Sequence, residues 1–170
     1  MTRKSFLSKG IAAILVLTAN MRGQDTSQQP SAADQKSIDQ DVDLMRKDVR
    51  SQKKQIIASN LNLTDAEAEK FWPVYDQYTA ELVKINDAKY GAIKQYANQY
   101  NTLTDDQALG LTRQVLGVDQ SVAQLRTKYV PIFNKVVSGK KTAYFFQLDR
   151  RLVMLIDIQL AAAIPMIQQS

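Results

Sequence analysis

The chain has 170 residues, among them 22 Lys and Arg and 17 Asp and Glu, but neither His nor Cys. The absence of His and Cys removes the usual general base, the thiolate nucleophile and the commonest transition-metal ligands. There is also no phosphate-binding Gly loop, and the paired carboxylates have no partner pattern suited to acid–base work. The sequence therefore predicts no enzymatic activity, no cofactor and no metal site; a metal site built on carboxylates or Met is the alternative that the composition leaves open.

The N-terminus has the layout of a secretory signal peptide. A short basic head precedes an apolar run over residues 11–19. This run is too short to cross a membrane, which takes ~20 apolar residues, so we expect no stable membrane insertion once the leader is removed. Cleavage after Ala19 and cleavage after Gly23 both fit the sequence, and a retained membrane anchor is the alternative. We therefore interpret residues 1–23 as a signal peptide.

The charge of the chain without this leader is close to neutral. Four bases and no acid precede Gln24, which leaves 18 bases and 17 acids. This balance gives no support for nucleic-acid binding, so no nucleic-acid partner is expected. Residues 24–34 have no apolar period and are predicted to form a flexible linker, and residues 35–170 are predicted to form a single all-helical domain.

Four helices are expected in that domain, which places the chain in the all-α class. The first begins near Gln35 and ends near Asn60, with a narrow apolar stripe that Gln52 interrupts. The second, from Thr64, has apolar residues in steps of three and four. The third, from Asp105, continues this period without a break, which predicts left-handed packing against a partner helix.

The second and third helices start with the same signal. A Thr can cap a helix with its hydroxyl, and a Glu or Gln three residues later can reach back to the backbone N–H of the cap. The pattern Leu-Thr-x-x-(Glu or Gln) occurs twice, at Leu63, Thr64 and Glu67 and again at Leu103, Thr104 and Gln107. We expect both sets of residues to act as helix-capping motifs.

A proline lies inside each of these two helices, in similar aromatic surroundings. If the helices form an antiparallel hairpin that turns near Asn101, Pro73 and Pro131 lie side by side and bend it. The flanking aromatic residues would then form one cluster, made of Phe71, Trp72, Tyr75, Tyr129 and Phe133. An aromatic core at a bent section and a protein-binding cluster are both compatible with this pattern.

The fourth helix is expected after a break at residues 137–139, where Ser138 can act as the cap. It carries two adjacent apolar stripes, which form a face wider than one neighbouring helix can cover. This face could close the bundle core, form a homodimer or contact other proteins. Its candidate protein-binding residues are Phe145, Phe146, Leu152, Ile156 and Leu160.

A secretory leader, an all-helical body and the paired Leu-Thr-x-x-(Glu or Gln) motifs together resemble the Spy/CpxP family of periplasmic proteins. The resemblance extends from about Gln35 to the C-terminus. It implies a long, bent antiparallel hairpin as the core, an elongated, cradle-like homodimer and a periplasmic location. Three features depart from the family. Glu67 stands where the motif has Gln, and the near-neutral charge differs from a strongly basic cradle. The absence of His and Cys argues against the zinc- and heavy-metal-responsive branches of the family.

The function that this resemblance implies is ATP-independent chaperoning of unfolded or stressed envelope proteins. The alternative is a role as an envelope-stress signalling accessory that binds and restrains the periplasmic domain of a membrane sensor kinase. A purely structural helical protein is a third possibility. Binding to a specific sensor should be sensitive to single charge reversals, whereas chaperoning should tolerate them.

Overall fold

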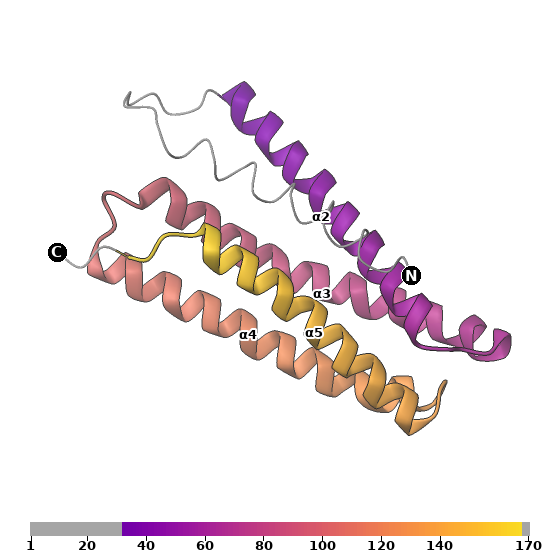
Figure 1. The fold of residues 1–170 in the computed structure, drawn as a ribbon. Coiled ribbons are helices and arrows are strands. Elements are labelled where there is room, and N and C mark those ends of the chain that lie inside the picture. The colour runs from indigo at the N-terminus through magenta and orange to yellow at the C-terminus, as the bar shows by residue number, and fades with distance from the viewer. Residues whose placement is uncertain (1–31, 168–170) are drawn as a thin grey trace. The chain divides into compact units, whose positions relative to one another are not determined.

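The computed structural model describes residues 32–167, with side chains described at Gln40 and from Asp43 onward. These residues form four α-helices and no strand: α2 (Ala32–Asn60), α3 (Asp65–Gln99), α4 (Asp105–Asn134) and α5 (Gly139–Ala163) (Figure 1). The predicted all-α class with four helices is therefore confirmed. No helix within the described range is long and apolar enough to span a membrane.

Helix α2 begins at Ala32, earlier than the expected start near Gln35. Its first two residues are alanines, which have the highest helix propensity, so the helix includes the end of the segment predicted as linker. The predicted leader, residues 1–23, and the rest of the predicted linker, residues 24–31, lie outside the described residues.

The described chain falls into two compact units. The α2–α5 unit contains α2 and Leu148–Met166, and the α3–α4 unit contains Leu61–Gln147. The first turns of α5 thus belong to the α3–α4 unit, and the remainder of that helix belongs to the α2–α5 unit.

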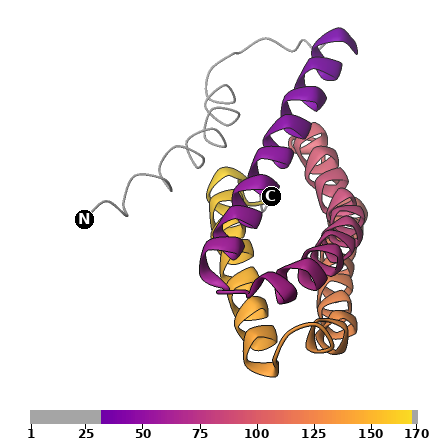
Figure 2. The same cartoon turned by 90° about the vertical axis from the view of Figure 1, so that its right-hand side faces the viewer.

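Helices α3 and α4 are antiparallel neighbours joined by the turn at residues 100–104 (Figure 1, Figure 2). Far from this turn, the ring centroids of Phe71 and Phe133 lie 5.1 Å apart. Closer to the turn, the side-chain amide of Gln114 donates to the carbonyl oxygen of Ala88 over 3.3 Å. These contacts place the proline-containing segments of the two helices at the same level.

Both helices continue through their internal prolines, Pro73 and Pro131, whose side chains are exposed. Helix α4 ends at Asn134. The hydroxyl oxygen of Ser138 then accepts from the backbone N–H of Lys141 over 3.3 Å. Ser138 therefore caps α5, as the sequence predicts.

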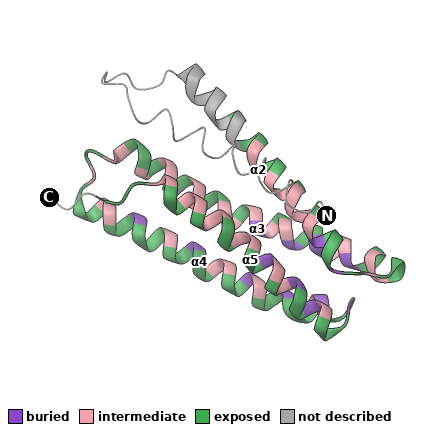
Figure 3. Cartoon of the chain, in the orientation of Figure 1, coloured by how far each residue is buried: buried purple, intermediate pink, exposed green. Residues whose placement is uncertain are grey.

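Most buried residues of the α3–α4 unit lie at the end of the helix pair away from the connecting turn (Figure 3). The largest fully buried side chains there are aromatic and come from α3, α4 and α5: Phe71, Tyr78, Phe133 and Phe145. Towards the turn, α4 buries aliphatic side chains in steps of seven residues. The core thus combines an aromatic end with a coiled-coil-like seam.

Candidate protein-binding surface

Capping boxes are present at the starts of both α3 and α4. In α3, the hydroxyl oxygen of Thr64 accepts from the N–H of Glu67 over 3.3 Å, and the carboxylate of Glu67 accepts from the N–H of Thr64 over 2.9 Å. In α4, Thr104 and Gln107 make the same two bonds at 3.4 and 2.9 Å. Each box pairs two N–H groups that lack helical partners. The leucines that precede the capping threonines, Leu63 and Leu103, are half-buried.

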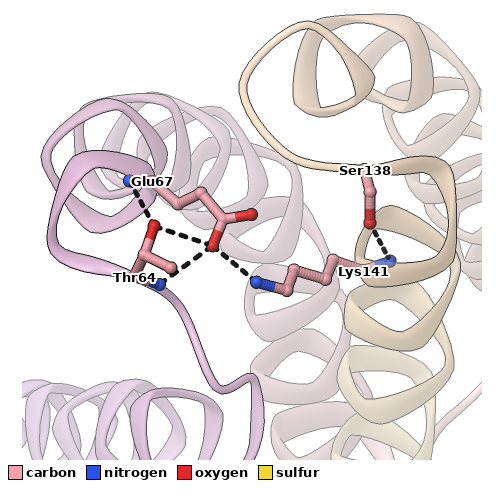
Figure 4. A network of polar contacts seen from close by, with 4 residues as sticks. All are labelled: Thr64, Glu67, Ser138 and Lys141. Carbon is pink, nitrogen blue, oxygen red and sulfur yellow. Dashed lines mark hydrogen bonds and ion pairs between the residues drawn. The ribbon is translucent and has the colours of Figure 1, made fainter.

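Glu67 also connects α3 to α5 (Figure 4). Lys141, in the first turn of α5, donates to the carboxylate of Glu67, with Nζ 2.5 Å from Oε2. This hydrogen bond, followed by the one from the Thr64 backbone, lowers the pKa of Glu67 below its usual value. A neutral Gln could close the capping box but could not form the ion pair. The Glu in place of Gln was the only sequence signal for this contact.

The aromatic residues near the two prolines form a cluster that lies in the core. The rings of Phe71 and Phe133 both contact Phe145 of α5, at centroid distances of 5.4 and 4.5 Å. Among the seven aromatic candidate protein-binding residues, five are buried and two are half-buried; the buried ones are Phe71, Tyr75, Tyr129, Phe133 and Phe145, and the half-buried ones are Trp72 and Phe146. Close burial of this kind is what the core interpretation of the cluster expects.

Tyr78 also belongs to the cluster, although the sequence placed it only on the α3 seam. Its ring lies 5.2 Å from that of Tyr129 and 6.0 Å from that of Phe133, between centroids. It is fully buried. The helical period of α3 placed Tyr78 on the correct face, but the predicted cluster was limited to aromatic residues next to the two prolines.

A polar network joins α3 to α4 beside the aromatic cluster. The hydroxyl of Tyr129 donates to Glu81 over 2.7 Å, and Nζ of Lys128 donates to both carboxylate oxygens over 2.9 and 2.7 Å. The hydrogen bond from Lys128, followed by that from Tyr129, lowers the pKa of Glu81. Burial, followed by the hydrogen bond to Glu81, raises the pKa of Tyr129 to about 12. The network fixes the two helices to each other.

The part of α5 in the α2–α5 unit has a half-buried and an exposed apolar face. The candidate residues Leu152, Ile156 and Leu160 lie on the half-buried face. Three other large apolar side chains are exposed: Met154 by 52%, Leu155 by 49% and Ile158 by 59%. Two exposed alanines continue the row along the helix. We call the exposed set the outer face of α5; it consists of Met154, Leu155, Ile158, Ala161 and Ala162.

The sequence prediction of protein-binding residues did not include the outer face. It selected members of the two densest apolar stripes, and Met154 and Ile158 belong to neither. The signal was present as a third row, because positions 154, 158 and 161 follow the helical period. Whether a stripe faces the protein or the solvent depends on neighbours that are distant in the sequence, so the period alone does not select the exposed row.

A buried ion pair joins α2 to α5 within the α2–α5 unit. Nζ of Lys53 lies 2.5 Å from Oδ1 of Asp149, and the two side chains are 12% and 0% exposed. Lys53 stands next to Gln52, where the apolar stripe of α2 is interrupted. The sequence showed that polar residues interrupt the apolar stripes of both α2 and α5, but it gave no indication that Lys53 and Asp149 contact each other.

Comparison with known proteins gives no relative from which a function could be transferred. No protein-family model matches the chain, and no curated protein and no solved structure shows significant similarity to it. Membership of the Spy/CpxP family therefore remains a prediction based on the two motifs and the predicted leader.

The outer face of α5 is the candidate protein-binding surface. It brings three large, exposed apolar side chains together within residues 154–158. On α4, by contrast, the exposed Leu109, Leu116 and Val130 are separated by about two helical turns or more. Within the described part of the chain, no group of three or more His, Cys, Asp or Glu residues is placed to hold a metal ion. The chemistry that the outer face offers is apolar contact.

Proposed function

We propose that the chain is a periplasmic, ATP-independent chaperone of the Spy/CpxP type, which acts as a homodimer and binds unfolded or stressed envelope proteins. The observation that carries the proposal is the outer face of α5, where Met154, Leu155 and Ile158 are about half exposed or more. Grouped apolar side chains on a protein surface mark interaction sites more often than single exposed residues do. The resemblance of the capping motifs to those of the family supports the same function.

The composition of the outer face suits weak contact with many sequences. Met is unbranched and polarizable, so it adapts to irregular apolar partners. A row of side chains on one helix offers no enclosed pocket that would demand a particular partner shape. Apolar contact needs neither nucleotide nor covalent chemistry, because its free energy comes from the removal of apolar area from water. These properties are those required to hold and release unfolded chains.

The aromatic cluster has a different role in this proposal. Phe71, Phe133 and Phe145 are fully buried and contact one another. A client could reach them only if the α3–α4 unit opened. We therefore assign the cluster to the stability of the helix pair and the outer face to client binding.

The test is light scattering from a chemically unfolded model protein diluted into buffer without nucleotide. The full chain is expressed and the processed form is purified from the periplasm, so that N-terminal sequencing also locates the cleavage site. Suppression of scattering at near-stoichiometric ratios is expected. The triple variant Met154→Ser/Leu155→Ser/Ile158→Ser should lose most of this suppression because it removes the exposed apolar side chains.

The matched control is Leu109→Ser/Leu116→Ser, which replaces exposed leucines on α4. It should suppress scattering as well as the unchanged protein does. If the unchanged protein gives no suppression even at several-fold excess, the chaperone proposal is wrong. A pull-down from envelope extract would then test the sensor-kinase role, in which single charge reversals should abolish binding.

A further inference from the structure

Two arginines stand at the start of the outer face of α5. Arg150 and Arg151 are both exposed. Within the described part of the chain neither forms an ion pair, although acidic residues are present on both helices of the α2–α5 unit. Two adjacent arginines are therefore exposed without a carboxylate partner among the described residues.

Each arginine begins a row of outer-face side chains. Residues four apart on a helix are neighbours on its surface, with about 5–6 Å between their Cβ atoms. Arg150 is thus followed by Met154 and Ile158, and Arg151 is followed by Leu155. The surface has a direction: it is cationic at its N-terminal end and apolar along the next two turns.

We infer that the outer face selects polypeptide segments in which acidic residues flank an apolar stretch, with the acidic residues at Arg150 and Arg151 and the apolar stretch along Met154, Leu155 and Ile158. This inference rests on the proposed function and specifies the class of client. Exposed arginines favour carboxylates in particular, because the planar guanidinium can donate two parallel hydrogen bonds to one carboxylate.

The opposite end of the face disfavours an acidic group. The C-terminal end of a helix carries partial negative charge, and α5 ends at Ala163, soon after Ala161 and Ala162. A client with its acidic residues at this end would meet like charge, so the surface favours one orientation of the client.

The experiment measures binding of short fluorescein-labelled peptides to the processed protein by anisotropy at low salt. Three peptides share one apolar core, flanked on one side by two Glu, two Lys or two Ser. The Glu-flanked peptide should bind tightest, by roughly two- to thirtyfold over the Ser-flanked peptide, as two exposed ion pairs allow. The difference should shrink at high salt because exposed charges are screened.

The decisive variant is Arg150→Glu/Arg151→Glu, which should reverse the preference so that the Lys-flanked peptide binds tighter than the Glu-flanked one. The matched control is Lys70→Glu/Arg113→Glu, which makes the same charge change at exposed positions of α3 and α4. This control should keep the original preference. Circular dichroism checks that each variant keeps its helices.

The outcomes separate this inference from the proposed function. Equal binding of all three peptides, together with normal suppression of aggregation, overturns the client class and leaves the chaperone function intact. If the protein neither binds any of the peptides nor suppresses aggregation, both the client class and the chaperone function are wrong.

Two other results would assign the outer face to a different occupant. Binding to phosphatidylglycerol vesicles but not to phosphatidylcholine vesicles, without any preference among the peptides, would assign the face to lipid. If the unchanged protein is a dimer and the Met154→Ser/Leu155→Ser/Ile158→Ser variant is a monomer, again without any preference among the peptides, the outer face would be assigned to contact with a second copy of the chain. Either result overturns the inference.

Discussion

Lys141 of α5 donates to Glu67, the residue that closes the capping box of α3, with Nζ 2.5 Å from Oε2. The corresponding residue of α4, Gln107, has an amide in place of the carboxylate and caps its helix at a similar distance. The cap therefore does not require a charge, but the ion pair with α5 does. This relationship gives the Glu in the first motif a physical role that Gln could not fill.

Glu67→Gln should keep the cap of α3 and lose the ion pair with Lys141. We expect a smaller loss of stability than for Thr64→Ala, which removes the capping hydroxyl and should cost about 1 kcal/mol. Urea unfolding followed by circular dichroism measures both losses. A Glu67→Gln variant that is less stable than Thr64→Ala would contradict this ranking of cap and ion pair.

The same substitution should also change how stability depends on pH. The pKa of Glu67 is lowered in the folded protein, so its contribution is present above the usual value near 4.5 and is lost as the pH falls through the lowered pKa. The difference between the unchanged protein and Glu67→Gln should therefore be full at pH 7 and should vanish in strong acid. A difference that stays constant down to pH 2 would exclude the ion pair as its cause.

The raised pKa of Tyr129 predicts that the protein loses stability at alkaline pH. Its pKa is raised from 10.0 to about 12, first by burial and then by the hydrogen bond to Glu81, so the folded protein favours the protonated phenol. Its contribution is thus complete below pH 10 and is lost as the pH rises towards 12. Tyr129→Phe should cost about 1 kcal/mol at pH 7, because it removes one hydrogen bond. The free energy of unfolding of this variant should also fall less steeply between pH 10 and 12 than that of the unchanged protein. If it falls just as steeply, the loss of stability comes from the other tyrosines.

The sequence predicted those parts of the fold that depend on local signals. The capping box at Thr104, the break at Ser138 and the seam of α4 each follow from residues within a few helical turns of one another. Local propensity and amphipathic period determine such features, and both can be read from a short stretch of sequence. The internal prolines did not end their helices, because the rest of each segment kept its apolar period.

Contacts between polar residues far apart in the chain could not be predicted. Tyr129 and Glu81 are separated by 48 positions, and Lys53 and Asp149 by even more. A single polar residue within an apolar stripe has no period that identifies its partner. Exposure on α5 was unpredictable for a related reason, since all rows of a broadly apolar helix look alike until its neighbours are known. The sequence predicted the row of Leu152 as the protein-binding surface, but that row is half-buried in the structure, and the exposed row is that of Met154.

Phe133 should be important for stability and unimportant for client binding. Its ring contacts Phe71 and Phe145 at centroid distances of 5.1 and 4.5 Å, and it is fully buried. Phe133→Ala should cost about 3–5 kcal/mol, whereas Val130→Ala, at an exposed site of the same helix, should cost less than about 0.5 kcal/mol. Unfolding can be followed by fluorescence of the single Trp, Trp72, which packs edge-on to Phe71 at 5.1 Å.

The same pair of variants separates the two interpretations of the aromatic cluster. If the cluster is core, Phe133→Ala should suppress aggregation normally at temperatures where it remains folded. Loss of suppression with little loss of stability would instead make the cluster a client-binding site and would argue against the outer face of α5.

The ion pair between Lys53 and Asp149 should hold α2 to α5, because it places a cation 2.5 Å from a fully buried carboxylate oxygen. Asp149 is fully buried and Lys53 nearly so. Lys53→Met should therefore cost about 3–5 kcal/mol, and the addition of Asp149→Leu should recover much of that loss, since a buried ion pair is often no more stabilising than apolar residues of similar volume. The matched control is Lys47→Met, at an exposed position of α2, which should cost less than about 0.5 kcal/mol.

Urea unfolding of the single and double variants gives the coupling energy between Lys53 and Asp149 from a double-mutant cycle. Amide hydrogen exchange then reports which segment is loosened, because regions that open locally exchange faster than the rest of the protein. Faster exchange should be confined to α2 and Leu148–Met166, since these segments form one unit. A coupling energy near zero, or faster exchange spread evenly over α3 and α4, would show that the pair does not hold α2 in place.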